Sequence, residues 1–266
     1  MAHRRTRRFP EMLMPGERRF VESFGKSIQN EDTPRLRWTT PRPARDTPAA
    51  AGTTRFCPMK ALLLIDLQND FLPGGPMGVP DGDAMLPLVQ QLQGQFRLVV
   101  ATQDWHPANH ANFAANHTAK NPGEIARLRR GLVLLRPVHC VQNTRGAELA
   151  PALNRERINR IFRTGADTNL DSFSAFFDGD HQTATGLGDY FRDKKVKEIF
   201  LCGLGAETTI LNTALDALGF EFKPVLIEDA CRGGSPEAAT KAIEEMKAAG
   251  VAFVNSREVL SWSVRQ

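Results

Sequence analysis

The chain has 266 residues, 41% of them hydrophobic, with 34 Lys and Arg, 30 Asp and Glu and a formal net charge of +4. Its length suffices for one sizeable core, and no apolar run approaches the roughly 18 residues of a membrane span, so we expect a soluble protein without a membrane partner. The four cysteines (Cys57, Cys140, Cys202 and Cys231) lack CxxC spacing, which argues against a thiolate metal cluster or a disulfide framework and fits a reducing cytoplasm.

The first 58 residues differ in composition from the rest. They hold 12 of the Lys and Arg and 6 of the Asp and Glu, which leaves 22 basic and 24 acidic side chains for the remainder. This segment is rich in Arg, Pro, Thr and Ala without sustained apolar periodicity, which predicts a disordered extension. A basic arm can bind nucleic acid, but its acidic residues dilute that signal. We therefore expect a dispensable tail at 1–58, no nucleic-acid partner, and one folded domain at 59–266.

Short apolar runs and helical stretches alternate beyond that point. The runs that predict buried strands of a mainly parallel sheet are 61–66, 97–103, 157–163, 197–203 and 222–228. Helices are predicted at about 83–95, 185–194, 207–219 and 235–249. This order predicts a doubly wound α/β fold with helices on both faces of the sheet. Ligands of such folds bind outside the carboxyl ends of the strands, where the polar motifs of this chain fall.

One carboxylate and two imidazoles form a candidate metal site. Asp104 and His106 lie in TQDWHP (102–107), and His139 lies in RPVHC (136–140). Such a set suits a divalent transition metal with coordination positions left open. Taken singly, each residue could be a turn aspartate or a surface histidine. Together they predict a site for Zn, Fe or Mn.

Asp66 ends the first predicted strand, in IDLQNDF (65–71). A carboxylate there can act as a general base, or it can cap the following turn by accepting backbone N–H bonds. The spacing alone leaves both roles open.

Six motifs follow one another in the order known from one enzyme family. They are IDLQNDF, TQDWHPANH, RPVHCVQNTRGAEL, DSFSAFFD, CGLGAETTILNTALDA and EDACRG. In these motifs the chain resembles the nicotinamidase/pyrazinamidase branch of the isochorismatase-like hydrolases, over about 59–259. The resemblance implies a Rossmann-like three-layer α/β sandwich, a divalent metal, a nicotinamide-like small ligand and a cytoplasmic role in NAD salvage. Family members use an aspartate, a lysine and a cysteine to attack a carboxamide and release ammonia.

The resemblance carries over only part of that catalytic set. Asp66 takes the place of the aspartate, and Asp104, His106 and His139 take those of the metal ligands. The lysine position holds Thr164, and the nucleophile position holds Thr209.

An alcohol is much less acidic than a thiol, which readily forms a thiolate near a cation and a helix N-terminus. We therefore expect a weak or inactive amidase. Cys140 and Cys202 are expected to be buried structural residues that do not replace the missing nucleophile.

The resemblance also places Phe71, Arg136, Gly205, Ala206 and Thr208 around the ligand. Arg136 and Thr208 stand where relatives carry aromatic residues, so a pyridine ring would lose stacking contacts worth about 0.5–1.5 kcal/mol each. An arginine beside a metal suits a small carboxylate, unless it points into solvent.

Two alternatives stay open. The chain could be an active hydrolase of the same superfamily on another small substrate, although isochorismatase-type relatives, which need no cysteine, depend on the lysine that is absent here. It could also be a regulatory pseudoenzyme that binds a small acid at its metal pocket, or that presents a surface to another copy in a homo-oligomer.

Overall fold

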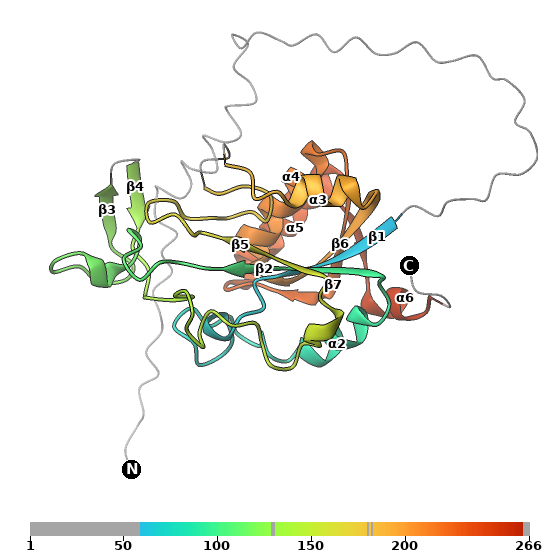
Figure 1. Ribbon diagram of the computed structural model, residues 1–266, viewed down its shortest axis with the longest axis horizontal. Coiled ribbons are helices and arrows are strands. Elements are labelled where there is room, and N and C mark those ends of the chain that lie inside the picture. The colour runs from blue at the N-terminus through green and yellow to red at the C-terminus, as the bar shows by residue number, and fades with distance from the viewer. Residues whose placement is uncertain (1–58, 129–130, 180, 182, 263–266) are drawn as a thin grey trace, which may run out of the picture. The chain divides into compact units, whose positions relative to one another are not determined.

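The computed structural model describes residues 59–128, 131–179, 181 and 183–262, which form a central sheet flanked by helices (Figure 1). The predicted extension at 1–58 lies outside the described residues, so its disorder and the boundary at residue 59 stay predictions. Six parallel strands are hydrogen-bonded in the order β5-β2-β1-β6-β7-β8. Their bounds are β1 (Met59–Ile65), β2 (Leu98–Asp104), β5 (Arg160–Thr164), β6 (Val196–Leu204), β7 (Lys223–Arg232) and β8 (Ala252–Val254). The predicted parallel α/β sheet is confirmed.

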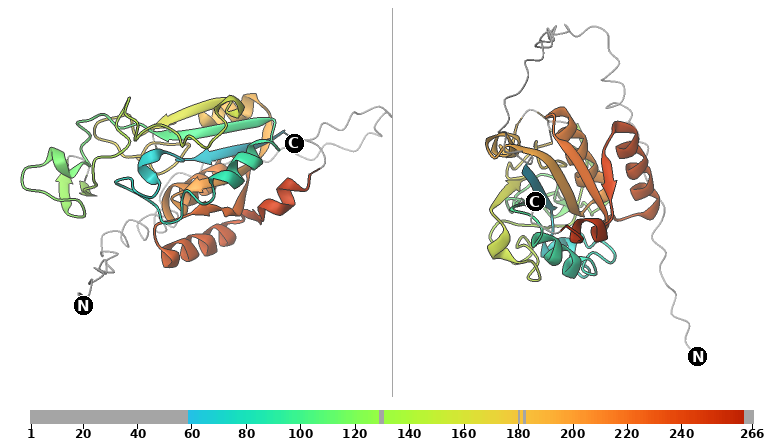
Figure 2. Two further views of the ribbon diagram at one scale, coloured as in Figure 1. Left: turned by 90° about the horizontal axis from the view of Figure 1, so that it is seen from below. Right: turned by 90° about the vertical axis from the view of Figure 1, so that its right-hand side faces the viewer.

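Helices form a layer on each side of this sheet, as Figures 1 and 2 show. One face is covered by α3 (Leu187–Asp193), α4 (Leu211–Gly219) and α5 (Pro236–Ala249), and the other by α2 (Leu86–Gln93) and α6 (Ser256–Leu260). Successive side chains of a strand point to opposite faces. Accordingly, Leu63 of β1 packs in the cluster of α3, α4 and α5, whereas Leu62 and Leu64 pack in that of α2 and α6. The continuous apolar run of β1 is thus explained by burial on both faces.

The apolar pattern did not predict the smallest elements. These are the antiparallel hairpin of β3 (Ile125–Leu128) and β4 (Gly131–Leu134), the edge strand β8 and the five-residue helix α6. Each is too short to show a period, and the hairpin extends away from the sheet (Figure 1), where Leu132 is 64% exposed. The strand expected at 157–163 begins only at residue 160, because residues 155–157 form a 3-10 turn that the Asn154 side chain caps.

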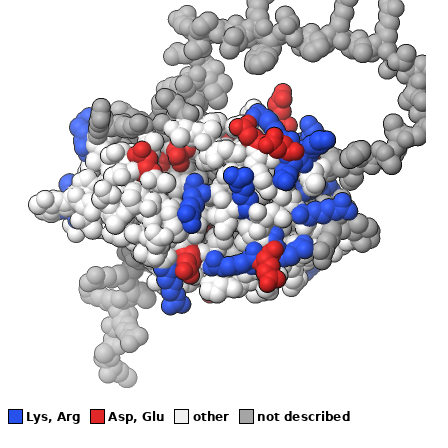
Figure 3. All heavy atoms as spheres, in the orientation of Figure 1, with Lys and Arg blue, Asp and Glu red and all other residues white. Residues whose placement is uncertain are grey.

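Within the described part of the chain, no helix has both the length and the apolar character to cross a membrane. On the face drawn in Figure 3, Lys and Arg side chains lie among Asp and Glu side chains. This mixture agrees with the near balance of charge beyond residue 58.

Two glycines shape the carboxyl ends of the central strands. Gly203 of β6 has φ +142°, and a Cβ there would lie 2.1 Å from the carbonyl oxygen of Ile65 in β1, so only glycine fits between the two strands. Gly205, with φ +75°, then starts a wide π-type turn, η4 (Ala206–Ile210), that leads into α4. The helix predicted at 207–219 therefore begins with a turn that brings Thr209 to the end of the sheet.

Candidate active site and metal centre

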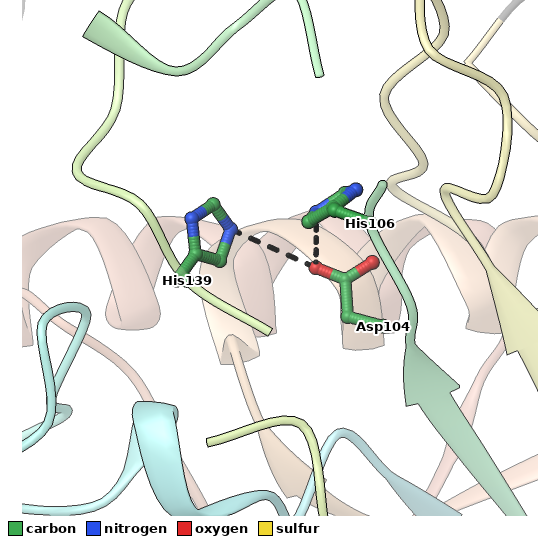
Figure 4. A group of neighbouring side chains, drawn as sticks. All are labelled: Asp104, His106 and His139. Atoms are coloured by element: carbon green, nitrogen blue, oxygen red, sulfur yellow. Dashed lines mark hydrogen bonds and ion pairs between the residues drawn. The ribbon is translucent and has the colours of Figure 1, made fainter. Parts of the chain in front are cut away.

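Asp104, His106 and His139 come together at the carboxyl end of β2. Asp104 is the last residue of β2, His106 follows two residues later, and His139 lies in the loop after β4. Figure 4 shows both imidazoles directed at the same carboxylate oxygen. The Nε2 atoms of His106 and His139 lie 3.0 and 3.8 Å from Oδ2 of Asp104, and the candidate ligand atoms are all within 4.8 Å of one another. The structure thus brings the predicted metal ligands into one buried cluster.

Backbone carbonyl groups hold the two imidazoles by their other ring nitrogen. Nδ1 of His106 lies 2.9 Å from the carbonyl oxygen of Gly165, and Nδ1 of His139 lies 2.8 Å from that of Pro137. A carbonyl only accepts, so each Nδ1 carries the proton, and in the neutral ring Nε2 keeps its lone pair. Bonds of this kind are what fixes the ring of a metal-binding histidine. Both imidazoles are therefore oriented to offer Nε2 to an ion.

The electrostatics of the cluster keep Asp104 ionised. Burial raises the pKa of Asp104, but the charges of His106 and His139 and the hydrogen bond from His106 outweigh it and lower the pKa below its usual value. Burial lowers the pKa of His106, yet the charge and hydrogen bond of Asp104 bring it to about 9. For His139, burial prevails and lowers the pKa. The carboxylate is thus kept ionised among groups that compensate its charge.

One atom of the cluster has no partner. Oδ1 of Asp104 is buried and accepts no hydrogen bond from any described residue. A buried acceptor left unpaired costs about 1–3 kcal/mol, and more when it is charged. A divalent ion held by Asp104, His106 and His139 would satisfy this carboxylate, so the residues present fit a metal.

Asp66 lies beside this cluster at the end of β1, with φ +50°. Its Oδ1 accepts a hydrogen bond of 2.6 Å from the hydroxyl of Thr102, and Thr209 makes a second side-chain hydrogen bond to it. Burial and the neighbouring charge of Asp104 raise the pKa of Asp66 to about 7, although both hydrogen bonds act in the opposite direction. Asp66 is therefore a buried carboxyl in contact with the hydroxyl at the predicted nucleophile position.

Thr164 lies outside the cavity beside Asp66. It ends β5, where it pairs in register with Asp104 and its carbonyl accepts a hydrogen bond from the backbone N–H of Trp105. Its side chain is buried and does not line the cavity beside Asp66. The neighbouring Arg163 instead lays its guanidinium over the Trp105 ring, 3.9 Å from the ring centroid.

The three thiols in the described part of the chain lie apart from the cavity. Burial raises the pKa values of Cys140 and Cys202 far above the usual thiol range and that of Cys231 to about 12. Cys57 lies outside the described residues. Among the cysteines that the structure places, none lines the cavity, which agrees with the structural role expected for Cys140 and Cys202.

A cavity of about 210 Å³ opens beside Asp66 and Asp104. Of the five residues expected to surround a ligand, four line it, namely Phe71, Arg136, Gly205 and Thr208. The fifth, Ala206, is buried and is not part of the lining, because in the first turn of η4 its side chain packs into the core.

Further polar and aromatic residues line the cavity that sequence reasoning did not select. Asp171 and Phe173 come from the DSFSAFFD segment, and Glu207 comes from the turn that carries Thr209. All three residues belong to the family motifs, and the position of Glu207 just after a strand, where ligands of such folds bind, could have indicated it. Nothing in the spacing indicates which side chains of an irregular loop face inward.

Known proteins share this fold over most of the described chain. A model of the isochorismatase domain matches residues 60–258. Nicotinamidase from Escherichia coli is 41% identical over 201 residues, which are 73% of this chain and 93% of that protein. The structure of a nicotinamidase/pyrazinamidase from Acinetobacter baumanii has a TM-score of 0.72 and 40% identity, covering 77% of this chain and all of that one. A pyrazinamidase from Pyrococcus horikoshii, solved in complex with zinc, has a TM-score of 0.62 and 34% identity, covering 74% and 99%.

The sheet topology, the site at the strand ends and these matches define a protein of the isochorismatase-like α/β hydrolase class. Within that class the chain belongs to the nicotinamidase branch.

Proposed function

We propose that this chain is a nicotinamidase-like protein that binds one divalent metal ion and hydrolyses amides weakly or not at all. The observation that carries the proposal is the pairing of Asp66 with a threonine hydroxyl. Asp66, to which the resemblance assigns the role of general base, lies at the end of β1, and the group it contacts at the predicted nucleophile position is Thr209.

The loss of reactivity follows from the acidity of the groups present. A cysteine at the start of a helix gives up its proton near neutral pH, whereas an alcohol needs a strong base held against it. Asp66 holds the Thr209 hydroxyl, but its own acceptor capacity is shared with Thr102. At the position implied for the family's lysine, Thr164 supplies no positive charge and does not line the cavity. Amide hydrolysis is therefore expected to fall by several orders of magnitude, since the members of a catalytic set act as a unit.

The metal would be held by Asp104, His106 and His139. The unpaired Oδ1 of Asp104 supports this assignment, as does the zinc in the Pyrococcus horikoshii pyrazinamidase structure. Sites with one oxygen and two imidazole ligands accept Zn, Fe or Mn. When bound, such an ion supplies a positive charge that orients a ligand or polarises its carbonyl group. We place the protein in the cytoplasm and in pyridine nucleotide salvage.

Ammonia release from nicotinamide and pyrazinamide tests the proposal. The metal-loaded wild type is compared with Thr209→Ala and with the Escherichia coli enzyme. We expect turnover at least about 1,000-fold below that enzyme. Turnover comparable to that enzyme, and unchanged by Thr209→Ala, would refute both the loss of activity and the assignment of residue 209.

Ammonia release and ligand-induced thermal shift together separate the two alternatives. Efficient release of ammonia from other amides in a panel would favour an active hydrolase with another substrate. Ligand-induced stabilisation without turnover would favour a binding or regulatory protein.

A further inference from the structure

Arg136 occupies a fixed place at the cavity. Its backbone N–H donates to the carbonyl of Asn112 at 2.8 Å, and its own carbonyl accepts from the backbone N–H of Ala114 at 2.9 Å. Its side chain lines the cavity and is 26% exposed. The arginine therefore starts from an anchored main chain, and its guanidinium belongs to the cavity wall.

One edge of that guanidinium is positioned by neighbouring side chains. Nε of Arg136 lies 3.8 Å from Oδ2 of Asp171, and the guanidinium carbon lies 5.8 Å from the centroid of the Phe173 ring. Asp171 is itself held, because it accepts a 2.6 Å hydrogen bond from the Asn112 amide and another from the backbone N–H of Ser172. Among the described residues, the two terminal nitrogens of Arg136 have no hydrogen-bond partner. They are left as donors at the cavity.

The carboxylate acceptors of the cavity, by contrast, are either hydrogen-bonded or buried. Asp104 faces the two histidines, and Asp66 accepts from Thr102. Glu207 accepts from the backbone N–H of Gly234 through Oε1, whereas its buried Oε2, like Oδ1 of Asp104, has no hydrogen-bond partner among the described residues. A ligand therefore meets the free donors on Arg136, because the two unpaired carboxylate oxygens are buried. This favours a ligand rich in acceptors.

We propose that Arg136 makes this cavity select a small carboxylate over the corresponding carboxamide, with Asp171 and Asn112 as positioning residues. The inference rests on the proposed function, in that it takes this cavity as the ligand site. A carboxylate can accept two parallel hydrogen bonds from a guanidinium and carries the opposite charge. A carboxamide offers one oxygen, and its NH2 group would face the donors of the arginine. The protein would then hold the acid, which is the product of its relatives' reaction, better than the amide.

Calorimetric titration with nicotinate and nicotinamide tests this selection. Metal-loaded protein carrying Thr209→Ala serves as the parent, so that turnover cannot obscure the binding of the amide. We expect nicotinate to bind at least about 10-fold more tightly than nicotinamide, the factor that one charge-assisted hydrogen bond is worth. Adding Arg136→Gln should reduce the preference to less than about 3-fold and leave the affinity for nicotinamide nearly unchanged.

Three further variants test whether the preference for nicotinate depends on Arg136. Arg136→Lys keeps the charge but not the planar fork, so an intermediate preference is expected. Asp171→Asn should reduce the preference without changing the metal content, which a purely structural role would not do. Arg163→Gln removes an arginine that stacks on Trp105 outside the cavity, and it should change nothing.

Several outcomes would overturn the proposal. They are equal or tighter binding of nicotinamide by the parent, no measurable binding of nicotinate, or a preference that survives in both Arg136→Gln and Arg136→Lys. Fast ammonia release by the wild type would refute the proposed function instead, and it leaves this comparison intact.

Discussion

The metal-ligand cluster and the turn that carries Thr209 lie at the same edge of one sheet, but they differ in the polar groups that surround their carboxylates. In the cluster each imidazole is oriented by a backbone carbonyl, and one oxygen of Asp104 is left for an ion. Beside the turn, the side-chain hydrogen bonds of the Asp66 carboxyl to described residues come from the hydroxyl groups of Thr102 and Thr209, and its pKa is raised to about 7 by burial and by Asp104. Under the proposed function, this chain would bind a metal ion at the first site and lack efficient attack on an amide at the second.

The largest expected effect is on the metal-ligand cluster. His106→Ala combined with His139→Ala removes two of the three candidate ligands, so the double variant should lose essentially all bound metal in elemental analysis. Chelation should lower the melting temperature of the wild type, because an ion that binds only the folded state stabilises it. The double variant should not respond to chelator. Full metal loading of that variant would rule out this ligand set.

A smaller effect on metal binding is expected from a substitution at Gly165, whose carbonyl orients His106. Gly165 has φ +63°, its carbonyl holds Nδ1 of His106, and a Cβ there would lie 2.5 Å from the imidazole. Gly165→Ala should therefore weaken metal affinity by about 10–100-fold, as loss of such an orienting partner commonly does.

Gly250 provides the matched control. It also has a positive φ, +96°, but a Cβ there would meet nothing within 4 Å. Gly250→Ala should cost about 1–2 kcal/mol of stability from backbone strain and leave metal affinity unchanged. Equal affinities of the two variants would show that the Gly165 carbonyl does not orient the ligand.

The contribution of Asp66 to the stability of the protein should depend on pH. The folded state raises the pKa of Asp66 from 3.8 to about 7, so it binds the proton more tightly than the unfolded chain does. The contribution of Asp66 to stability is then full below about pH 4 and is lost as the pH rises through about 7. In metal-free protein, Asp66→Asn should become more stable relative to the wild type between about pH 5 and pH 8. A melting-temperature difference that is constant over this range would contradict the shifted pKa.

The smallest effect is expected from the N-terminal extension. Its composition predicts that residues 1–58 do not contribute to the fold. A chain that begins at Met59 should therefore unfold within about 1 kcal/mol of the full-length protein in denaturant titrations. A larger loss would mean that the extension docks on the domain.

The sequence was sufficient for five of the six strands of the sheet and for the choice of the three clustered side chains, because both leave local signals. Buried parallel strands read as apolar runs, and Asp104 and His106 sit two residues apart just where such a run ends. The sequence did not predict how the side chains in the loops are oriented. Ala206 was expected at the ligand but packs into the core, and Arg136 is paired with Asp171, 35 positions away. Such contacts depend on how irregular loops pack together, which leaves no periodic pattern in the sequence.

Restoring the missing groups tests the separation of metal binding from catalysis most directly. Ammonia release from nicotinamide is measured for the metal-loaded wild type, Thr164→Lys, Thr209→Cys and the double variant. The account predicts little turnover by the wild type and either single variant, and a partial gain of at least about 10-fold in the double variant, because a nucleophile and its electrostatic partner act together. Robust turnover by the wild type that survives Thr209→Ala would contradict it.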